Sequence, residues 1–212
     1  IIETPPTGRL PITTQVGPYD EAVVRKAIQQ ELDRNGQVFY VHNRVQSLQT
    51  RLNFIHALMP GVSVGVVHGQ MSGPAIEKVM WEFLHRKHQV LLATTIIESG
   101  IDIPTVNTLI VEEAEEFGLS QLYQLRGRVG RDRTKAFCFL FYSPGVPLTS
   151  EARARLEALR EFTELGSGYR LAVRDMEIRG AGNLLGQQQH GFIAAVGLDL
   201  YSQLLQDEIA RL

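Results

Sequence analysis

The sequence lacks the features on which small secreted and membrane proteins depend. It has one cysteine in 212 residues, which rules out a disulfide framework or a cysteine-rich zinc site and favours a reducing compartment such as the cytoplasm. No apolar run reaches the roughly 18 residues that span a bilayer, and no signal peptide is recognisable. The net charge of −2 argues against a uniformly basic, histone-like binder but leaves room for local basic patches.

A phosphate-binding loop of the form GxxxxGK[ST] is also absent, although one segment is well suited to a polyphosphate. The octet Gln124–Arg131 (QLRGRVGR) carries three arginines and two glycines. A guanidinium can bind two phosphate oxygens and never loses its charge, and glycine lets the backbone approach a ligand closely. The octet therefore predicts half of a nucleotide site, the half that supplies arginines. A solvated basic loop is the alternative.

Strand and helix patterns alternate over the first two thirds of the chain. Apolar runs typical of buried strands are separated by amphipathic helical patterns. Because such strands are apolar on both sides, they predict an α/β fold with a parallel sheet and helices on both faces. The strands are expected at residues 12–16, 38–42, 62–67, 90–93, 108–111 and 136–141, with Cys138 buried in the last.

The remaining third changes character after Pro147. We expect Ser150 to cap one helix, a second helix to run from about Tyr169 to Arg179, and a glycine-rich loop and closing helix to follow. Earlier in the chain, Gly36 is expected to stop the first helix. The sequence thus predicts two parts, residues 1–147 with the sheet and residues 148–212 with a helical hairpin, a loop and a helix.

A second polar segment, Ala93–Pro104 (ATTIIESGIDIP), follows a predicted strand. Thr94 stands at the strand end, and Gly100 and Asp102 come a few residues later. Hydroxyls and backbone amides at such a place suit phosphate or ribose. A lone Gly-x-Asp is usually a turn, but the arginine octet about 22 residues later makes a nucleotide site the stronger interpretation.

Ligands of parallel α/β sheets bind beyond the carboxyl ends of the strands. Informative loops are therefore expected after His42, Val67, Thr94 and Glu112. The strand before the last of these loops, with its two carboxylates (Thr108–Glu113), resembles a Walker B strand. It has no phosphate loop upstream, however, and four carboxylates lie at its end. We interpret these as a solvated or ion-paired cluster and assign no metal; its members are Glu112, Glu113, Glu115 and Glu116.

The two polar segments resemble motifs of the superfamily 2 helicases. Gln124–Arg131 resembles motif VI (QxxGRxGR), and Ala93–Pro104 resembles motif V. Gln37–Arg44 stands where motif IV would be, and His68–Met71 resembles the segment after the next strand. Together they imply the second RecA-like lobe of a helicase motor over roughly residues 10–147.

Motifs in residues 175–201 narrow this resemblance to a smaller group of helicases. Asp175–Gly186, Gln189–Gly191 and Val196–Tyr201 closely resemble the translocation motif of bacterial transcription-repair coupling factors, which branched-DNA remodelling helicases share. Thr95–Glu98 and Phe117–Leu122 favour the coupling factors. The implied activity is ATP-dependent movement on double-stranded DNA, with displacement of stalled RNA polymerase and recruitment of excision-repair proteins. A branched-DNA helicase and a non-catalytic DNA-binding module are the alternatives.

The resemblance implies roles for individual residues. Arg128 and Arg131 would be arginine fingers that reach the γ-phosphate of ATP, and Gln124 would help to position that site. Gly100 and Asp102 would line the nucleotide. The Mg²⁺ ligands would belong to the first RecA-like lobe, so that the chain alone should be inactive.

Other positions would contact DNA or couple nucleotide state to DNA movement. DNA strand phosphates are implied as partners of Thr94, His68 and Gly69, and coupling is implied at Arg155, Arg179 and Gln189. Simpler roles remain open, namely a strand-end hydrogen bond for Thr94, a capped turn for His68 and an ion pair within its own helix for Arg179.

Overall fold

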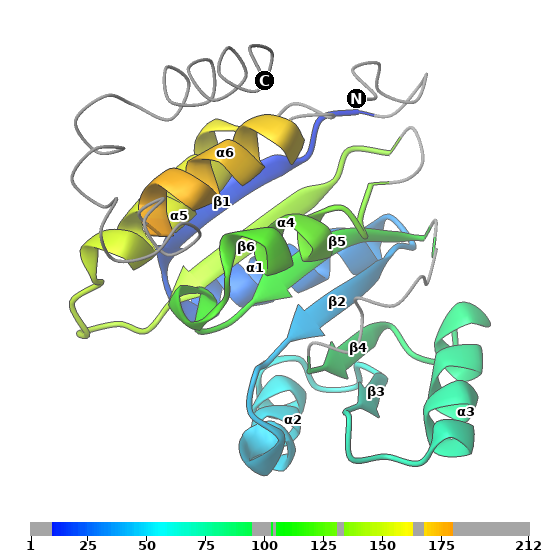
Figure 1. Cartoon of the computed structure of the whole chain (residues 1–212). Coiled ribbons are helices and arrows are strands. Elements are labelled where there is room, and N and C mark those ends of the chain that lie inside the picture. The colour runs from blue at the N-terminus through cyan, green and yellow to red at the C-terminus, as the bar shows by residue number, and fades with distance from the viewer. Residues whose placement is uncertain (1–9, 95–102, 104, 131–133, 163–167, 180–212) are drawn as a thin grey trace, which may run out of the picture.

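The computed structural model describes residues 10–94, 103, 105–130, 134–162 and 168–179. Helices and strands alternate through most of this part of the chain (Figure 1). The elements are β1 (Thr13–Pro18), α1 (Glu21–Asp33), β2 (Gln37–Val41), η1 (Val45–Ser47), α2 (Leu48–Leu58), β3 (Val64–Val67), α3 (Gly73–Leu84), β4 (Val90–Ala93), β5 (Val106–Val111), η3 (Ala114–Glu116), α4 (Leu119–Arg126), β6 (Phe137–Tyr142), α5 (Ser150–Glu161) and α6 (Gly168–Arg179).

The six strands found among the described residues form one sheet in the order β1-β6-β5-β2-β4-β3. All paired strands are parallel, as predicted. At the carboxyl edge, Val41 lies between Val111 and Ala93, and Ala93 lies beside Val67. The residues that follow these strands are therefore neighbours along one edge of the sheet.

Helices cover both faces of this sheet (Figure 1). Successive side chains of a strand point to opposite faces, and the core divides accordingly. Tyr40 and Ile110 belong to a cluster with residues of α1 and α2. Phe39 and Leu109 belong to a second cluster with residues of α3, α4, α5 and α6. The prediction of a parallel sheet covered on both faces is confirmed.

Helices α5 and α6 stand where the hairpin is predicted. They pack against each other and against α4, and Leu156, Leu159 and Leu171 share a core cluster with Leu125. The hairpin is thus part of the same hydrophobic core as the sheet. The predicted glycine-rich loop and closing helix lie outside the described residues, and the division at residue 147 stays a prediction.

Two helix boundaries differ from the prediction. Helix α5 is capped by Thr149, whose side chain accepts a hydrogen bond from the amide of Ala152, and Ser150 is the first helical residue. Helix α1 ends at Asp33, and the left-handed residue after it is Asn35, with φ of 58°, rather than Gly36. A Cβ atom on Gly36 would lie 1.7 Å from Oε1 of Glu31, so that the Glu31 side chain would have to move.

Candidate functional site

The predicted phosphate-contacting residues lie together at the carboxyl edge of the sheet. Thr94 follows β4 and His68 follows the neighbouring strand β3, and the amide of Thr94 donates to the carbonyl of Val67 at 3.2 Å. Thr94 is 5% exposed, and this amide hydrogen bond is the strand-end hydrogen bond considered as the simpler role. Gly69, which follows His68 in the chain, is exposed.

His68 stands in a turn, because its carbonyl accepts from the amide of Met71 at 3.0 Å. Its Nδ1 is buried and has no hydrogen-bond partner among the described residues. A buried ring nitrogen without a partner costs free energy, so this nitrogen has capacity for one more polar contact. The structure therefore brings Thr94, His68 and Gly69 together, which suits a shared ligand at this edge.

Glu112, which follows β5, is the centre of a buried polar network. It is 2% exposed. It accepts a hydrogen bond from the hydroxyl of Tyr40, one from Nδ1 of His42 at 2.8 Å, and an ion pair from Nε of Arg51 at 2.9 Å. With the His42 proton on Nδ1, its Nε2 can accept from Ser47 at 2.7 Å. Glu112 is thus ion-paired. Of the two states predicted for the acidic cluster, solvated or ion-paired, it adopts the second.

This network changes the acidity of two tyrosines. Burial, followed by the nearby charge of Glu112, raises the pKa of Tyr40 well above its usual value. Burial also raises the pKa of Tyr19 to about 12, and its hydroxyl lies 3.1 Å from that of Tyr40. Both phenols therefore stay neutral at physiological pH, and the network holds its carboxylate through neutral and cationic donors.

The rest of the acidic cluster is spread around the same edge. Glu113 has a left-handed backbone with φ of 49° and pairs with Nε of Arg44 at 3.0 Å. Glu115 accepts a hydrogen bond from the amide of Ser143 at 2.9 Å, and Glu116 is exposed. Within the described residues, no group of three or more His, Cys, Asp or Glu is arranged to hold a metal ion.

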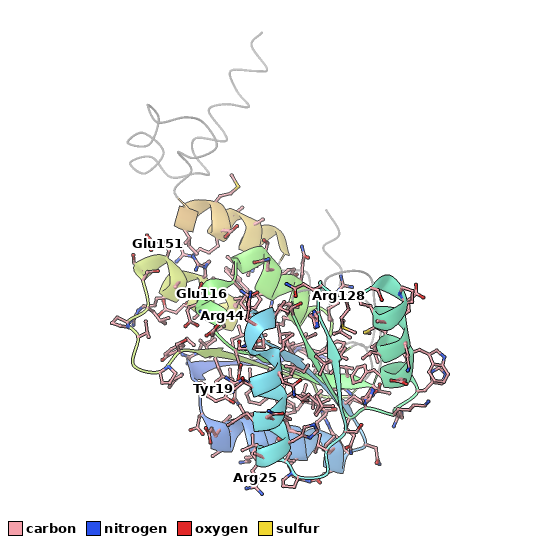
Figure 2. All side chains as sticks on the ribbon, turned by 90° about the horizontal axis from the view of Figure 1, so that it is seen from below. Tyr19, Arg25, Arg44, Glu116, Arg128 and Glu151 are labelled. Atoms are coloured by element: carbon pink, nitrogen blue, oxygen red, sulfur yellow. The ribbon has the colours of Figure 1, made fainter. Side chains whose placement is uncertain are left out.

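The arginine octet is carried by α4 and the turn that follows it. The leucines at 119, 122 and 125 of α4 are buried, whereas Gln124 is exposed on the opposite side. Arg128 is half-buried, and its amide donates to the carbonyl of Leu125 at 3.0 Å. The helix thus presents Gln124 outward and fixes the backbone of Arg128 one turn later. Figure 2 marks Arg128.

Gly130 anchors the end of the described octet to the sheet. Its amide donates to the carbonyl of Val106 at 3.3 Å, which is the first residue of β5. Its φ of +69° is left-handed, and a Cβ atom would lie 2.6 Å from Cβ of Ala136, so that glycine is required on both grounds. The described part of the octet therefore ends at the amino edge of the sheet, and the rule that places ligands at the carboxyl edge does not extend to it.

Arg126, in the middle of the octet, is turned away from any solvent-borne ligand. It is 4% exposed, and its Nη1 donates to the carbonyl of Leu159 in α5 at 2.8 Å. Burial lowers the pKa of its guanidinium. The sequence contains the signal for this, because positions 119, 122 and 126 fall on one stripe of a helix. Arg126 is therefore not exposed to a phosphate in solution.

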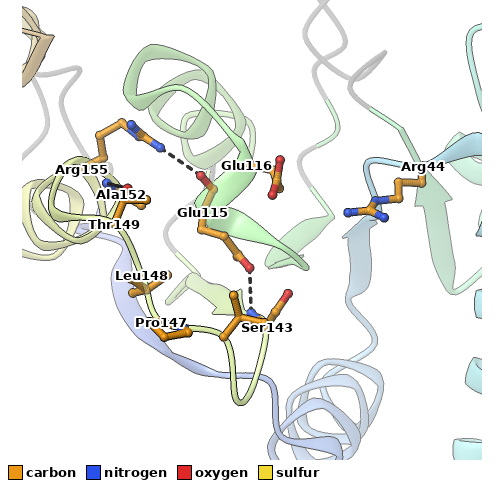
Figure 3. Close-up of a pocket in the computed structure, with 10 residues that line it drawn as sticks. Arg44, Glu115, Glu116, Ser143, Pro147, Leu148, Thr149, Ala152 and Arg155 are labelled. Carbon is orange, nitrogen blue, oxygen red and sulfur yellow. Dashed lines mark hydrogen bonds between the residues drawn. The ribbon is translucent and has the colours of Figure 1, made fainter.

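Arg155 joins α5 to the loop after β5. Its Nη2 donates to the carbonyl of Glu115 at 2.9 Å. It lines a pocket of about 520 Å³ between that loop, the end of β6 and α5 (Figure 3). Arg44, Glu116 and Thr149 line the same pocket. The predicted coupling residue therefore touches both the sheet-bearing part and the hairpin.

Several predicted site residues cannot be placed. Gly100, Asp102, Arg131 and Gln189 lie outside the described residues, and Arg179 ends α6 with its side chain outside the description. Ile103, which follows Asp102, and Val129, two residues before Arg131, belong to one core cluster. Their predicted roles stay predictions.

The family model for the helicase conserved C-terminal domain matches residues 22–133. The chain belongs to the helicase C-terminal domain family. This match covers α1 through the octet, so it includes the carboxyl-edge residues and Arg128.

The similarity of this helicase domain to curated relatives extends beyond the family model. It is 53% identical to the transcription-repair-coupling factor of Myxococcus xanthus over 100% of this chain and 18% of that protein. It is 51% identical to the one of Staphylococcus haemolyticus over 99% of this chain and 18% of that protein. The chain thus spans about a fifth of the length of these relatives, and the similarity includes the tail.

Solved structures agree on the fold. RecG bound to a three-way DNA junction matches with a TM-score of 0.70 and 36% identity, over 88% of this chain and 24% of that chain. Dbp5 L327V of S. cerevisiae, bound to RNA and ADP BeF3, matches with a TM-score of 0.56 and 14% identity, over 79% of this chain and 45% of that chain. The RecA-like fold of a helicase C-terminal lobe is therefore confirmed.

None of the helices in the described ranges is long and apolar enough to cross a membrane.

Proposed function

We propose that this helicase domain is the second motor lobe and translocation element of an ATP-dependent double-stranded DNA translocase. Its biological role would be transcription-coupled DNA repair in the cytoplasm, through displacement of stalled RNA polymerase and recruitment of excision-repair proteins. The observation that carries this proposal is the identity of about half over the whole chain, hairpin and tail included, with two transcription-repair-coupling factors.

ATP would bind between this lobe and the first RecA-like lobe of the same protein. In this proposal Arg128 and Arg131 reach the γ-phosphate, Gln124 positions them, and Gly100 and Asp102 line the nucleotide. The donor chemistry fits, because Arg128 is half-buried in a turn whose backbone is fixed at Leu125 and Val106. Mg²⁺ would be held by the first lobe, which also supplies the phosphate loop.

DNA would lie along the carboxyl edge. Thr94, His68 and Gly69 would contact a strand phosphate there, and His68 Nδ1 is a buried nitrogen with spare hydrogen-bonding capacity. Arg155, Arg179 and Gln189 would pass the opening and closing of the cleft to the DNA, as a two-state domain closure. The link from Arg155 to the carbonyl of Glu115 supports this part of the proposal.

The test of this assignment compares ATP binding with ATP hydrolysis in the intact protein. Arg128→Ala and Arg131→Ala should each lower DNA-stimulated hydrolysis by about 10³-fold or more, because an arginine finger acts on the transition state. ATP binding should change little. The 212-residue chain alone should hydrolyse no ATP, since it has no phosphate loop.

The matched control is Arg174→Ala, which removes an arginine that is 47% exposed on α6. Loss of ATP binding in Arg128→Ala, with the residual hydrolysis unchanged, would contradict the finger role. Robust DNA-stimulated turnover by the isolated chain would contradict the division of the site between two lobes.

A branched-DNA remodelling helicase is the second candidate. It is favoured by the match to RecG, which covers 88% of this chain at 36% identity. The motor would be the same, but the substrate would be a DNA junction rather than a polymerase on linear duplex. The higher identity to the coupling factors makes the first candidate the better supported one.

A further inference from the structure

The buried guanidinium of Arg126 is unusual for its position. Arginine is rarely buried without a partner, because removing its charge from water is costly. Yet Arg126 is 4% exposed on the last turn of α4, two residues before the predicted finger Arg128. Such a cost is tolerated only where the contacts of the side chain offset it, so these contacts indicate what Arg126 does.

Its hydrogen bond reaches the hairpin, and its ring contact lies within its own helix α4. Nη1 donates to the carbonyl of Leu159 at 2.8 Å, and the guanidinium carbon lies 5.2 Å from the centre of the Tyr123 ring. Leu159 belongs to the last turn of α5, where carbonyl groups have no partner within the helix and carry partial negative charge. Arg126 therefore caps the carboxyl end of α5 with a charged side chain that comes from α4.

A second hydrogen bond runs from the hairpin to the sheet-bearing part. Arg155 of α5 donates to the carbonyl of Glu115 at 2.9 Å, and Glu115 in turn accepts from the amide of Ser143. Helix α5 is thus held at two points, one by a guanidinium from the sheet-bearing part and one by its own guanidinium. Of these two bonds, the bond from Arg126 starts inside the octet itself.

The described backbone between Arg126 and the sheet is short and well anchored. Gly127, Arg128 and Val129 continue the chain from α4 through i-to-i+3 and i-to-i+4 hydrogen bonds, and Gly130 is bonded to Val106. A Cβ atom on Gly127 would lie 3.2 Å from the carbonyl of Gln124, so this turn is tight. A displacement of the Arg128 backbone would therefore also displace the end of α4, and with it the cap on α5.

We propose that Arg126 is a positioning residue that ties the arginine octet to helix α5, so that displacement of the octet is transmitted to the hairpin. It does not bind phosphate. This inference rests on the proposed function, and it adds a link that starts in the octet to the coupling predicted for Arg155, Arg179 and Gln189.

The test uses Arg126→Met and Arg126→Lys in the intact protein, with Arg174→Met as the matched control. Arg174 is another helical arginine, but it is 47% exposed and pairs with the exposed Glu177, so its loss should matter little. Two quantities are measured, the rate of DNA-stimulated ATP hydrolysis and the number of protein roadblocks displaced from linear duplex per ATP hydrolysed.

Arg126→Met should keep hydrolysis within about threefold of the unaltered protein. It should lower displacement per ATP by about tenfold, the effect of one lost charged hydrogen bond. Arg126→Lys retains the charge and an ammonium donor group. Its displacement per ATP should therefore lie between that of Arg126→Met and that of the unaltered protein. A parallel fall of hydrolysis and displacement would overturn the proposal, and so would no change in either. If Arg126→Met does not fold, the Lys variant decides by the same criteria.

A second measurement separates this link from the proposed function. In the 212-residue chain, hydrogen exchange of α5 should be about tenfold faster in Arg126→Met, because its carboxyl end loses a cap. Exchange of α3 should not change, and Arg174→Met should resemble the unaltered chain. Unchanged exchange in α5 would overturn the link. If the unaltered intact protein displaced no roadblock, the proposed function would fail while the exchange result still stood.

Discussion

Glu112 is a buried carboxylate that serves several side chains at once. It is almost fully buried, and it is the common acceptor of Tyr40, His42 and Arg51. Because it joins β5 to β2 and to α2, it holds the carboxyl edge on which the predicted DNA contacts stand. Removing one partner of a buried ion pair leaves an uncompensated charge, which is worse than removing both.

Glu112→Gln should therefore lower the free energy of unfolding by about 3 kcal/mol, the lower end of the usual range for a buried pair. Arg51 is 26% exposed, so water can compensate part of its charge, which places the effect at that lower end. Urea unfolding of the 212-residue chain measures it. Glu116→Gln, at an exposed position of the same cluster, is the control and should change stability by less than about 0.5 kcal/mol. Equal effects of the two substitutions would contradict the network.

At the scale of elements, the start of α5 shows what a sequence pattern leaves open. Thr149 and Ser150 are both good capping residues, and the sequence alone favoured Ser150. In the structure, Thr149 has extended backbone angles and accepts from the amide of Ala152 at 3.1 Å. Only the backbone conformation distinguishes the two, because a capping residue must be non-helical.

Thr149→Ala should destabilise α5 by about 1 kcal/mol, the usual effect of losing a side-chain cap. Thermal unfolding of the 212-residue chain can detect this as a lower Tm. Ser150→Ala is the neighbouring control, and since alanine is a good helix former it should be neutral or slightly stabilising. The opposite order of the two effects would mean that the helix begins one residue later.

The sheet and its helices could be predicted because each strand and helix has its own pattern of apolar residues within a short stretch of sequence. Each of the six predicted strands is found with boundaries that differ by at most a few residues, as β1 and β6 show. The burial of Arg126 was not predicted, although its spacing from Leu119 and Leu122 fits one face of a helix, and the partners of Glu112 were not predicted either. Their partners Leu159 and Arg51 are distant in sequence, and contacts of that kind depend on tertiary packing.

At the scale of the whole molecule, the two parts of the proposed site lie at opposite edges of the sheet. The predicted DNA contacts stand at the carboxyl edge, after β3 and β4, whereas Gly130, the last described residue of the octet, bonds to the first residue of β5. Five residue steps along a parallel strand span about 16 Å. Nucleotide and DNA would therefore be sensed at separate places, and coupling requires the rigid elements between them. Helix α5, bonded to the octet and to the loop after β5, is such an element.

The most direct test of the proposed function is release of stalled RNA polymerase from linear, unbranched duplex by the intact protein. We predict release that requires ATP hydrolysis and is abolished by Arg128→Ala. A forked DNA substrate without polymerase, measured in parallel, should be remodelled much less efficiently. ATP-dependent remodelling of the fork without any release of the polymerase would contradict the account and establish the branched-DNA helicase in its place.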